Sequence, residues 1–311
     1  MAASLGVVVA IVVLILPLSP AYDLNVFLRA GDAALHGRNI YPAIGSPAVY
    51  SGSSFVYPAV TAWPFVLLAL LPAGLAGAIY FVVCACAVIA ATTFESDRDH
   101  WIPLLVLGTA FTITGLQLGS LSPLLFVGAV CLWKLRDRPA IFGLVAAPVI
   151  VSKLFLAPLL VWPLLAKRYR AFAWATSLTV LLLAVSFATG SLSLPGYLQL
   201  LSELGRHEAR AGFGLISLLR NLSLTPLAAQ ATALGVATVL MVIAYAHYLR
   251  ARDERILYSA GIVSALLLSP VVWSHYLVLL PAALLALDAR RRWFIALAIT
   301  SWAIAPPHGL H

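Results

Sequence analysis

The sequence is dominated by apolar runs long enough to cross a lipid bilayer, separated by short polar stretches. Hydrophobic residues make up 62% of the 311 residues and charged residues only 10%, whereas a soluble domain carries about 25% charged residues. Within a bilayer only helices and closed barrels satisfy the backbone, and these continuous runs lack the short alternation of barrel strands. The chain is therefore predicted to be an all-α polytopic membrane protein, with one domain over residues 1–311.

The net charge of +8 comes from basic residues that gather between the apolar runs. Such clusters mark the cytoplasmic loops of membrane proteins, so the charge does not indicate nucleic-acid binding. The clusters cover residues 134–138, 167–170, 250–255 and 290–292. We expect all four on the cytoplasmic side.

This placement of the clusters predicts the path of most of the chain. Residues 139–166 must cross and return, turning near Lys153, although each arm has only about 13 residues and a full span needs about 20. Half-length helices of this kind usually line a cavity. A polar outer loop is expected at 190–224, and the other spans at 171–189, 226–248, 256–272, 276–288 and 293–305.

The first third of the chain is less regular. We interpret residues 1–20 as the first span rather than a signal peptide, because no basic residue precedes the apolar stretch. Residues 59–93 and 102–133 are broken apolar stretches, of which one must cross once and the other twice. The sequence leaves that choice open, and with it the side of the acidic patch at 95–99. Altogether we expect roughly 10–12 membrane-embedded helices.

Asp23 is distinguished from the other acidic residues by its position directly after the first span. A carboxylate at that depth is costly unless solvated or paired, which indicates a functional site. The alternative is that Asp23 caps the following helix. Helical spacing predicts an amphipathic helix on the membrane surface, in the first outer loop; its members are Leu24, Phe27, Leu28, Gly31 and Leu35.

Several cations lie on the predicted outer face, against the usual charge bias. Lys153 is at the tip of the short hairpin and His275 is at another outer turn, while the 190–224 loop adds Arg206, His207, Arg210 and Arg220. Pairing with Glu203 and Glu208 explains part of this set, and a bound phosphate would explain all of it. The alternatives are snorkelling for Lys153 and an ordinary polar contact for His275.

Short motifs follow one another along most of the chain. Asp23 precedes the amphipathic stretch, and Lys153 lies in an apolar hairpin ahead of a basic cluster. The others are His36-Gly37-Arg38-Asn39-Ile40-Tyr41, Phe55-Val56-Tyr57-Pro58, Gly115-Leu116-Gln117, Ser269-Pro270 and Trp273-Ser274-His275-Tyr276. In this order they resemble glycosyltransferase family 87, of the GT-C superfamily. The chain departs from the family pattern where Leu116 separates a glycine–glutamine pair and where Ala59 replaces a second proline.

The resemblance implies a GT-C-like bundle that moves a sugar, mannose above all, from a polyprenyl-phosphate donor to a lipid or glycan acceptor. Asp23 matches the catalytic base. Lys153 and His275 match positions that bind the donor phosphate, with Arg206, Arg210 and Arg220 as further candidates. Substrate-pocket candidates are Tyr22, Tyr41, Tyr57, Gln117 and Trp273, although an interfacial aromatic belt would also explain the tyrosines.

The remaining expectations concern surroundings and alternatives. We expect no cofactor, metal or nucleic-acid partner, and contacts with membrane lipids. The protein should be multi-pass in a bacterial inner (plasma) membrane, with its site facing the periplasm or the cell exterior. The alternative is a polytopic transporter or a flippase for lipid-linked sugars, which would show inverted repeats and charges at the bilayer midplane.

Overall fold

The computed structural model describes residues 21–50, 54–95 and 99–304, and in these ranges it is helical, without a strand. The all-α prediction is confirmed. Three helices are long and apolar enough to cross a membrane, namely α4 (Ala73–Glu95), α10 (Tyr169–Thr189) and α13 (Pro226–Ala251). The predicted first span, residues 1–20, lies outside the described residues.

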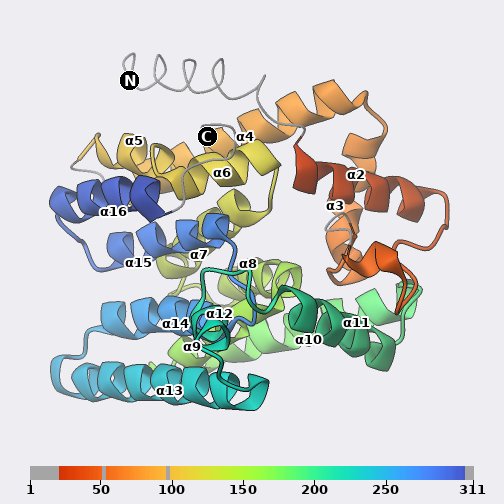
Figure 1. Ribbon diagram of the computed structural model, residues 1–311. Coiled ribbons are helices and arrows are strands. Elements are labelled where there is room, and N and C mark those ends of the chain that lie inside the picture. Colours follow the sequence, from red (N-terminus) through yellow and green to blue (C-terminus); the bar gives the residue numbers. More distant parts are fainter. Residues whose placement is uncertain (1–20, 51–53, 96–98, 305–311) are drawn as a thin grey trace.

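The long helices lie in different parts of the bundle, with α4 at the top of the view and α13 at the bottom (Figure 1). Each of them turns apolar side chains outward. On α13, Val242 and Ile243 are 60% and 62% exposed, and on α10 Val180 is 59% exposed. Such exposure is costly in water and normal in lipid. The buried positions on α13 are mostly alanines, which allow the neighbouring helix α14 (Glu254–Leu268) to approach closely.

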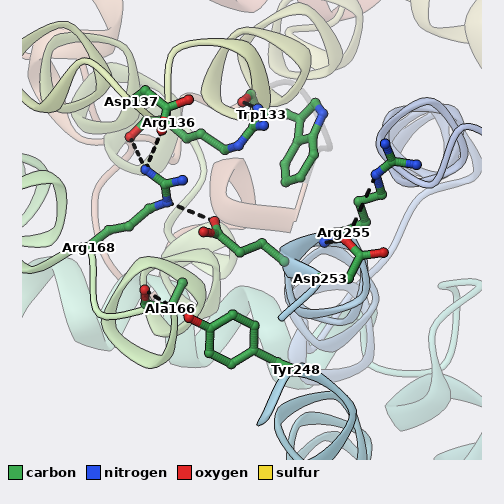
Figure 2. A network of polar contacts seen from close by, with 9 residues as sticks. Trp133, Arg136, Asp137, Ala166, Arg168, Tyr248, Asp253 and Arg255 are labelled. Carbon is green, nitrogen blue, oxygen red and sulfur yellow. Dashed lines mark hydrogen bonds and ion pairs between the residues drawn. The ribbon is translucent and has the colours of Figure 1, made fainter. Parts of the chain in front are cut away.

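Three of the four basic clusters meet at one end of the bundle (Figure 2). Arg168, just before α10, donates from Nη1 to Asp137 at 2.7 Å and from Nε to Glu254 at 2.7 Å. Asp137 lies between α7 (Ser122–Lys134) and α8 (Pro139–Ser152), whereas Glu254 begins α14. The arginine therefore joins three loops that are distant in sequence, as the prediction of a common side requires.

The structure also resolves the path through residues 59–133. Asp99, between α4 and α5 (Ile102–Leu107), lies 3.6 Å from Arg291 at the start of α16 (Arg291–Ile304). At the other end of α6 (Ala110–Leu118), Gly119 approaches Leu24 so closely that a Cβ would meet it at 2.6 Å. Thus α4 runs once along the bundle towards Arg291, α5 and α6 together run back towards α2, and α7 runs the length again.

The short hairpin at 139–166 is confirmed. Helix α8 ends at Ser152, Lys153 makes the turn, and the return arm consists of η3 (Leu154–Leu160) and α9 (Val161–Leu165). Gly143 lets α8 pack closely along α10, because a Cβ there would lie 2.7 Å from Cβ of Trp174. The hairpin thereby delivers Lys153 to the end of the bundle opposite the basic clusters.

That opposite end is built from the connecting segments. The predicted amphipathic helix is present as α2 (Tyr22–Leu35), which packs on α3 (Trp63–Ala69) through stacked Phe27 and Phe65 rings with centroids 4.6 Å apart. Helix α11 (Leu194–Glu208) and α12 (Leu215–Asn221) lie in the 190–224 loop. Two 3-10 helices, η1 (Pro47–Tyr50) and η2 (Ala59–Ala62), also lie at this end of the bundle. Helix α15 (Leu280–Ala286) then leads from this end back to the fourth basic cluster.

Candidate active site

A cavity of about 1190 Å³ opens at the end of the bundle away from the Arg168 network. Most of its wall comes from five segments: the first turns of α2, the aromatic stretch 54–58, the turn 152–155, one face of α11, and residues 268–276. Single residues from other segments complete it, among them Thr114 and Leu118 of α6. Most of the wall is apolar, with Tyr57, Phe155 and Tyr276 among the larger rings. Few charged side chains line the cavity, and because a charge in an apolar cavity is costly, each of them indicates a function.

Asp23 lies in the first turn of α2 and lines this cavity. The N-cap of α2 is Ala21, with φ 42°, and no side chain caps the helix. The alternative that Asp23 is the cap is therefore wrong. Its side chain is 24% exposed, and burial raises the pKa of the carboxyl from the ordinary 3.8 to about 6, although the charge of Lys153 acts in the opposite direction.

Lys153 extends from the hairpin turn into the same cavity. Its ammonium donates a hydrogen bond to Oη of Tyr276. Nζ also lies 4.3 Å from the centroid of the Tyr57 ring and 4.5 Å from that of Tyr276. Aromatic faces attract a cation without neutralising it. The side chain is thus directed into the cavity rather than towards a membrane surface, and its positive charge is available there.

His275 completes the polar group. It lies in η4 (Ser274–Leu279), where its side chain is 6% exposed, and Nε2 is 4.0 Å from Oδ2 of Asp23. Its ring meets that of Tyr276 edge to face, with centroids 4.6 Å apart. Residues 23, 153 and 275 therefore come together from three distant parts of the chain.

The structure brings together some of the predicted site residues and not others. Those that line the cavity are Tyr22, Asp23, Tyr57, Lys153, Trp273 and His275. Tyr41 stands behind the wall and donates a hydrogen bond to the carbonyl of Tyr57 at 2.9 Å. Gln117 is half-buried and is not part of the lining, although Thr114 and Leu118 of the same helix are.

The three predicted arginines do not line the cavity. Arg206 and Arg210 are exposed, and Nε of Arg206 bonds the Ser202 carbonyl at 3.3 Å. Arg220 donates from Nη1 to the Leu224 carbonyl at 2.6 Å. These arginines were predicted to bind phosphate because they lie near one another in the sequence, but in the structure their side chains lie outside the cavity.

Glu208 is a cavity residue that the sequence reasoning assigned to charge pairing in the loop. It is half-buried on the last turn of α11, and burial raises the pKa of its carboxyl. The signal that could have found it is helical spacing, because the cavity face of α11 consists of Tyr197, Leu201, Leu204, Gly205 and Glu208. Among the described residues no three His, Cys, Asp or Glu side chains gather as metal ligands.

This arrangement provides a proton acceptor and a cation in one partly dry space. A carboxyl with a pKa near neutrality can accept a proton at physiological pH and release it again. A lysine ammonium held by aromatic rings can stabilise an anion that forms beside it. Together they suit a reaction in which a hydroxyl is deprotonated and an anionic group departs.

A family model for glycosyltransferase family 87 matches residues 55–270, more than half of the chain. The matched residues include Lys153 and Glu208, whereas Asp23 and His275 lie outside them. No curated protein and no solved structure matches the chain. With its helical membrane architecture, the chain belongs to glycosyltransferase family 87, a family of the GT-C type.

Proposed function

We propose that this membrane glycosyltransferase moves a sugar, with mannose as the first candidate, from a polyprenyl-phosphate donor to a lipid or glycan acceptor. Asp23 is the general base in this proposal. The observation that carries it is the meeting of Asp23, Lys153 and His275 in one cavity. Base and cation come from separate segments, and buried charges that the fold brings together in a cavity are typical of functional sites.

The distribution of charge supports an outward-facing site. Three of the four basic clusters meet around Arg168 (Figure 2), and none of their residues lines the cavity. Positive clusters face the cytoplasm in multi-pass proteins. The cavity then faces the periplasm or the cell exterior, where a lipid-linked sugar rather than a nucleotide sugar is the available donor class.

The proposed reaction is a single displacement. The Asp23 carboxylate takes the proton from an acceptor hydroxyl as that oxygen attacks the anomeric carbon of the donor sugar. The new glycosidic bond forms while the bond between the anomeric carbon and the phosphate oxygen breaks, and its electron pair leaves with the lipid phosphate. The anomeric configuration is inverted. Because phosphate departs as a stable anion, one carboxylate suffices, unlike the pair used in glycoside hydrolysis.

The other cavity residues have roles that follow from their positions. Lys153 stabilises the departing phosphate. His275, 4.0 Å from Asp23, holds the carboxylate in place. Apolar side chains on the α11 wall, including Leu201 and Leu204, offer a surface for the first prenyl units of the donor.

The test compares sugar transfer by the wild type, Asp23→Asn and Asp32→Asn in membranes supplied with radiolabelled polyprenyl-phosphate mannose, glucose or galactose. Asp32 is the matched control, because it lies on the same helix but is 45% exposed and pairs with His36 at 3.1 Å. We expect transfer by the wild type and Asp32→Asn and none by Asp23→Asn at equal protein level. Equal product from all three contradicts the role of Asp23. No transfer from any lipid donor favours the transporter alternative.

A further inference from the structure

One face of α11 forms a wall of the catalytic cavity. Tyr197, Leu201, Leu204, Gly205 and Glu208 line it at the spacing of a single helical stripe. Glu208 is the charged member of this stripe. Next to it, Gly205 leaves open space, since no atom lies within 4 Å of where its Cβ would be.

The stripe is held in a fixed orientation. Tyr197 is 2% exposed and donates from Oη to the Val56 carbonyl at 3.0 Å. On another side of the helix, Glu203 accepts a hydrogen bond from the Gly45 amide at 3.1 Å. These contacts join α11 to the segments on either side of the aromatic stretch. Glu208 therefore faces the cavity because the helix is locked, and not because a flexible loop carries it there.

In the described part of the chain, no hydrogen bond or ion pair holds the Glu208 carboxylate, although the group is half-buried. The basic side chains within electrostatic reach of it are Lys153 and His207. The two carboxylate oxygens therefore remain available as acceptors on the cavity side. A ligand that brings hydroxyl donors into the cavity can bind them there.

We propose that Glu208 is a specificity-determining residue that accepts hydrogen bonds from hydroxyls of the donor sugar. This inference rests on the function proposed above. Lys153 is within electrostatic reach of both Asp23 and Glu208. If its ammonium holds the donor phosphate, the sugar bonded to that phosphate lies beside the lysine, where Glu208 can meet it. Asp23 is then left to the acceptor hydroxyl.

The experiment measures kcat and KM with purified enzyme for the polyprenyl-phosphate sugar that the wild type uses and for its singly deoxygenated analogues. The variants are Glu208→Ala, Glu208→Gln and Glu203→Gln. Glu203 is the matched control, because it lies on the same helix, half-buried but away from the cavity lining, and Gln keeps an oxygen for the Gly45 amide.

We expect Glu208→Ala to lower kcat/KM for the full sugar by about 10- to 100-fold, the usual effect of losing a hydrogen bond to a charged group. With one deoxy analogue the wild type should already be slow, and Glu208→Ala should cause no further loss. The kcat/KM of Glu208→Gln for the full sugar should fall between those of the wild type and Glu208→Ala. The kcat/KM of Glu203→Gln should match that of the wild type.

Several results would overturn the inference. A loss in Glu208→Ala that is equal for every analogue indicates a role in structure rather than recognition. Unchanged kinetics in Glu208→Ala show that the sugar does not contact this residue. If the wild type transfers none of the lipid-linked sugars, both the proposed function and this inference are wrong. If the wild type is active but Glu208→Ala shows an equal loss for every analogue or unchanged kinetics, only the inference is wrong.

Discussion

Replacing Asp23 by Asn tests the electrostatics of the site without any knowledge of the substrates. Burial raises the pKa of this carboxyl from 3.8 to about 6, and a pKa difference of one corresponds to about 1.4 kcal/mol. The ionised carboxylate therefore destabilises the folded state by up to about 3 kcal/mol at neutral pH. Asn has nearly the same shape and no charge, so Asp23→Asn should be the more stable protein although it is inactive.

The stability difference between Asp23→Asn and the wild type should depend on pH. The folded-state pKa lies above the unfolded one, so the folded wild type binds its proton first as the pH falls. Wild-type stability then rises between pH 6 and about 4, and the advantage of Asp23→Asn disappears there. Above pH 6 the full difference should be present.

The assay is thermal unfolding of purified proteins in one detergent, at about pH 7.5 and about pH 4. We expect the midpoint of Asp23→Asn to exceed that of the wild type by several degrees at the higher pH and to match it at the lower. Asp32→Asn should show no gain, because that side chain is 45% exposed. An Asp23→Asn protein that is no more stable at neutral pH, or equally favoured at both pH values, would refute the argument.

Four further predictions follow from particular contacts. Transfer should fall about tenfold from pH 7 to pH 5, because Asp23 must be ionised, and a flat pH–rate profile would contradict this. Lys153→Gln should lower kcat by about 100-fold or more and move the acidic limb to higher pH, since the ammonium lowers the pKa of Asp23; Lys153→Arg should retain more activity. Gly143→Ala should cost about 1–3 kcal/mol of stability, measured by unfolding, because its Cβ would meet Trp174. Gly205→Ala, which meets open space, should instead stabilise α11 by about 0.5–1 kcal/mol.

The path of the chain could be predicted from residue 134 onward because the bilayer constrains it strongly. Basic clusters fixed which turns share a side, and the run between two of them was too short for two full spans. The turn at Lys153 followed from that length alone. The contacts of Arg168 with Asp137 and Glu254 show the same loops together.

Hydropathy could not resolve residues 59–133, because an interrupted apolar stretch has two physical explanations. One is a turn at a membrane surface, as at Pro72. The other is a break inside a crossing segment, as between α5 and α6, where the Thr109 side chain accepts a hydrogen bond from the Thr112 amide. Composition is the same in both cases, and the distinction depends on tertiary contacts such as Asp99 with Arg291.

The site was predicted in part, and the errors have a common cause. Asp23 and Lys153 stood out because a charge beside an apolar span is costly wherever it points. Predicting the cavity residues of α11 would have required knowing which face of this helix is turned towards the cavity. Arg206 and Glu208 are two positions apart, yet the arginine is exposed while the glutamate lines the cavity. A cluster of charges on a sequence does not reveal which one the helix turns inward.

Charged side chains have opposite effects on stability at the two ends of the bundle. At the basic end, Arg168 is bonded by two carboxylates at 2.7 Å, so its charge serves to hold loops together. In the cavity, Asp23 is held 4.0 Å from His275 and keeps a raised pKa, so its charge reduces stability. Folding alone would favour a neutral side chain at this position. Such a cost at one residue is expected where a reaction needs the group, and a bound acceptor hydroxyl would recover part of it by donating a hydrogen bond to the carboxylate.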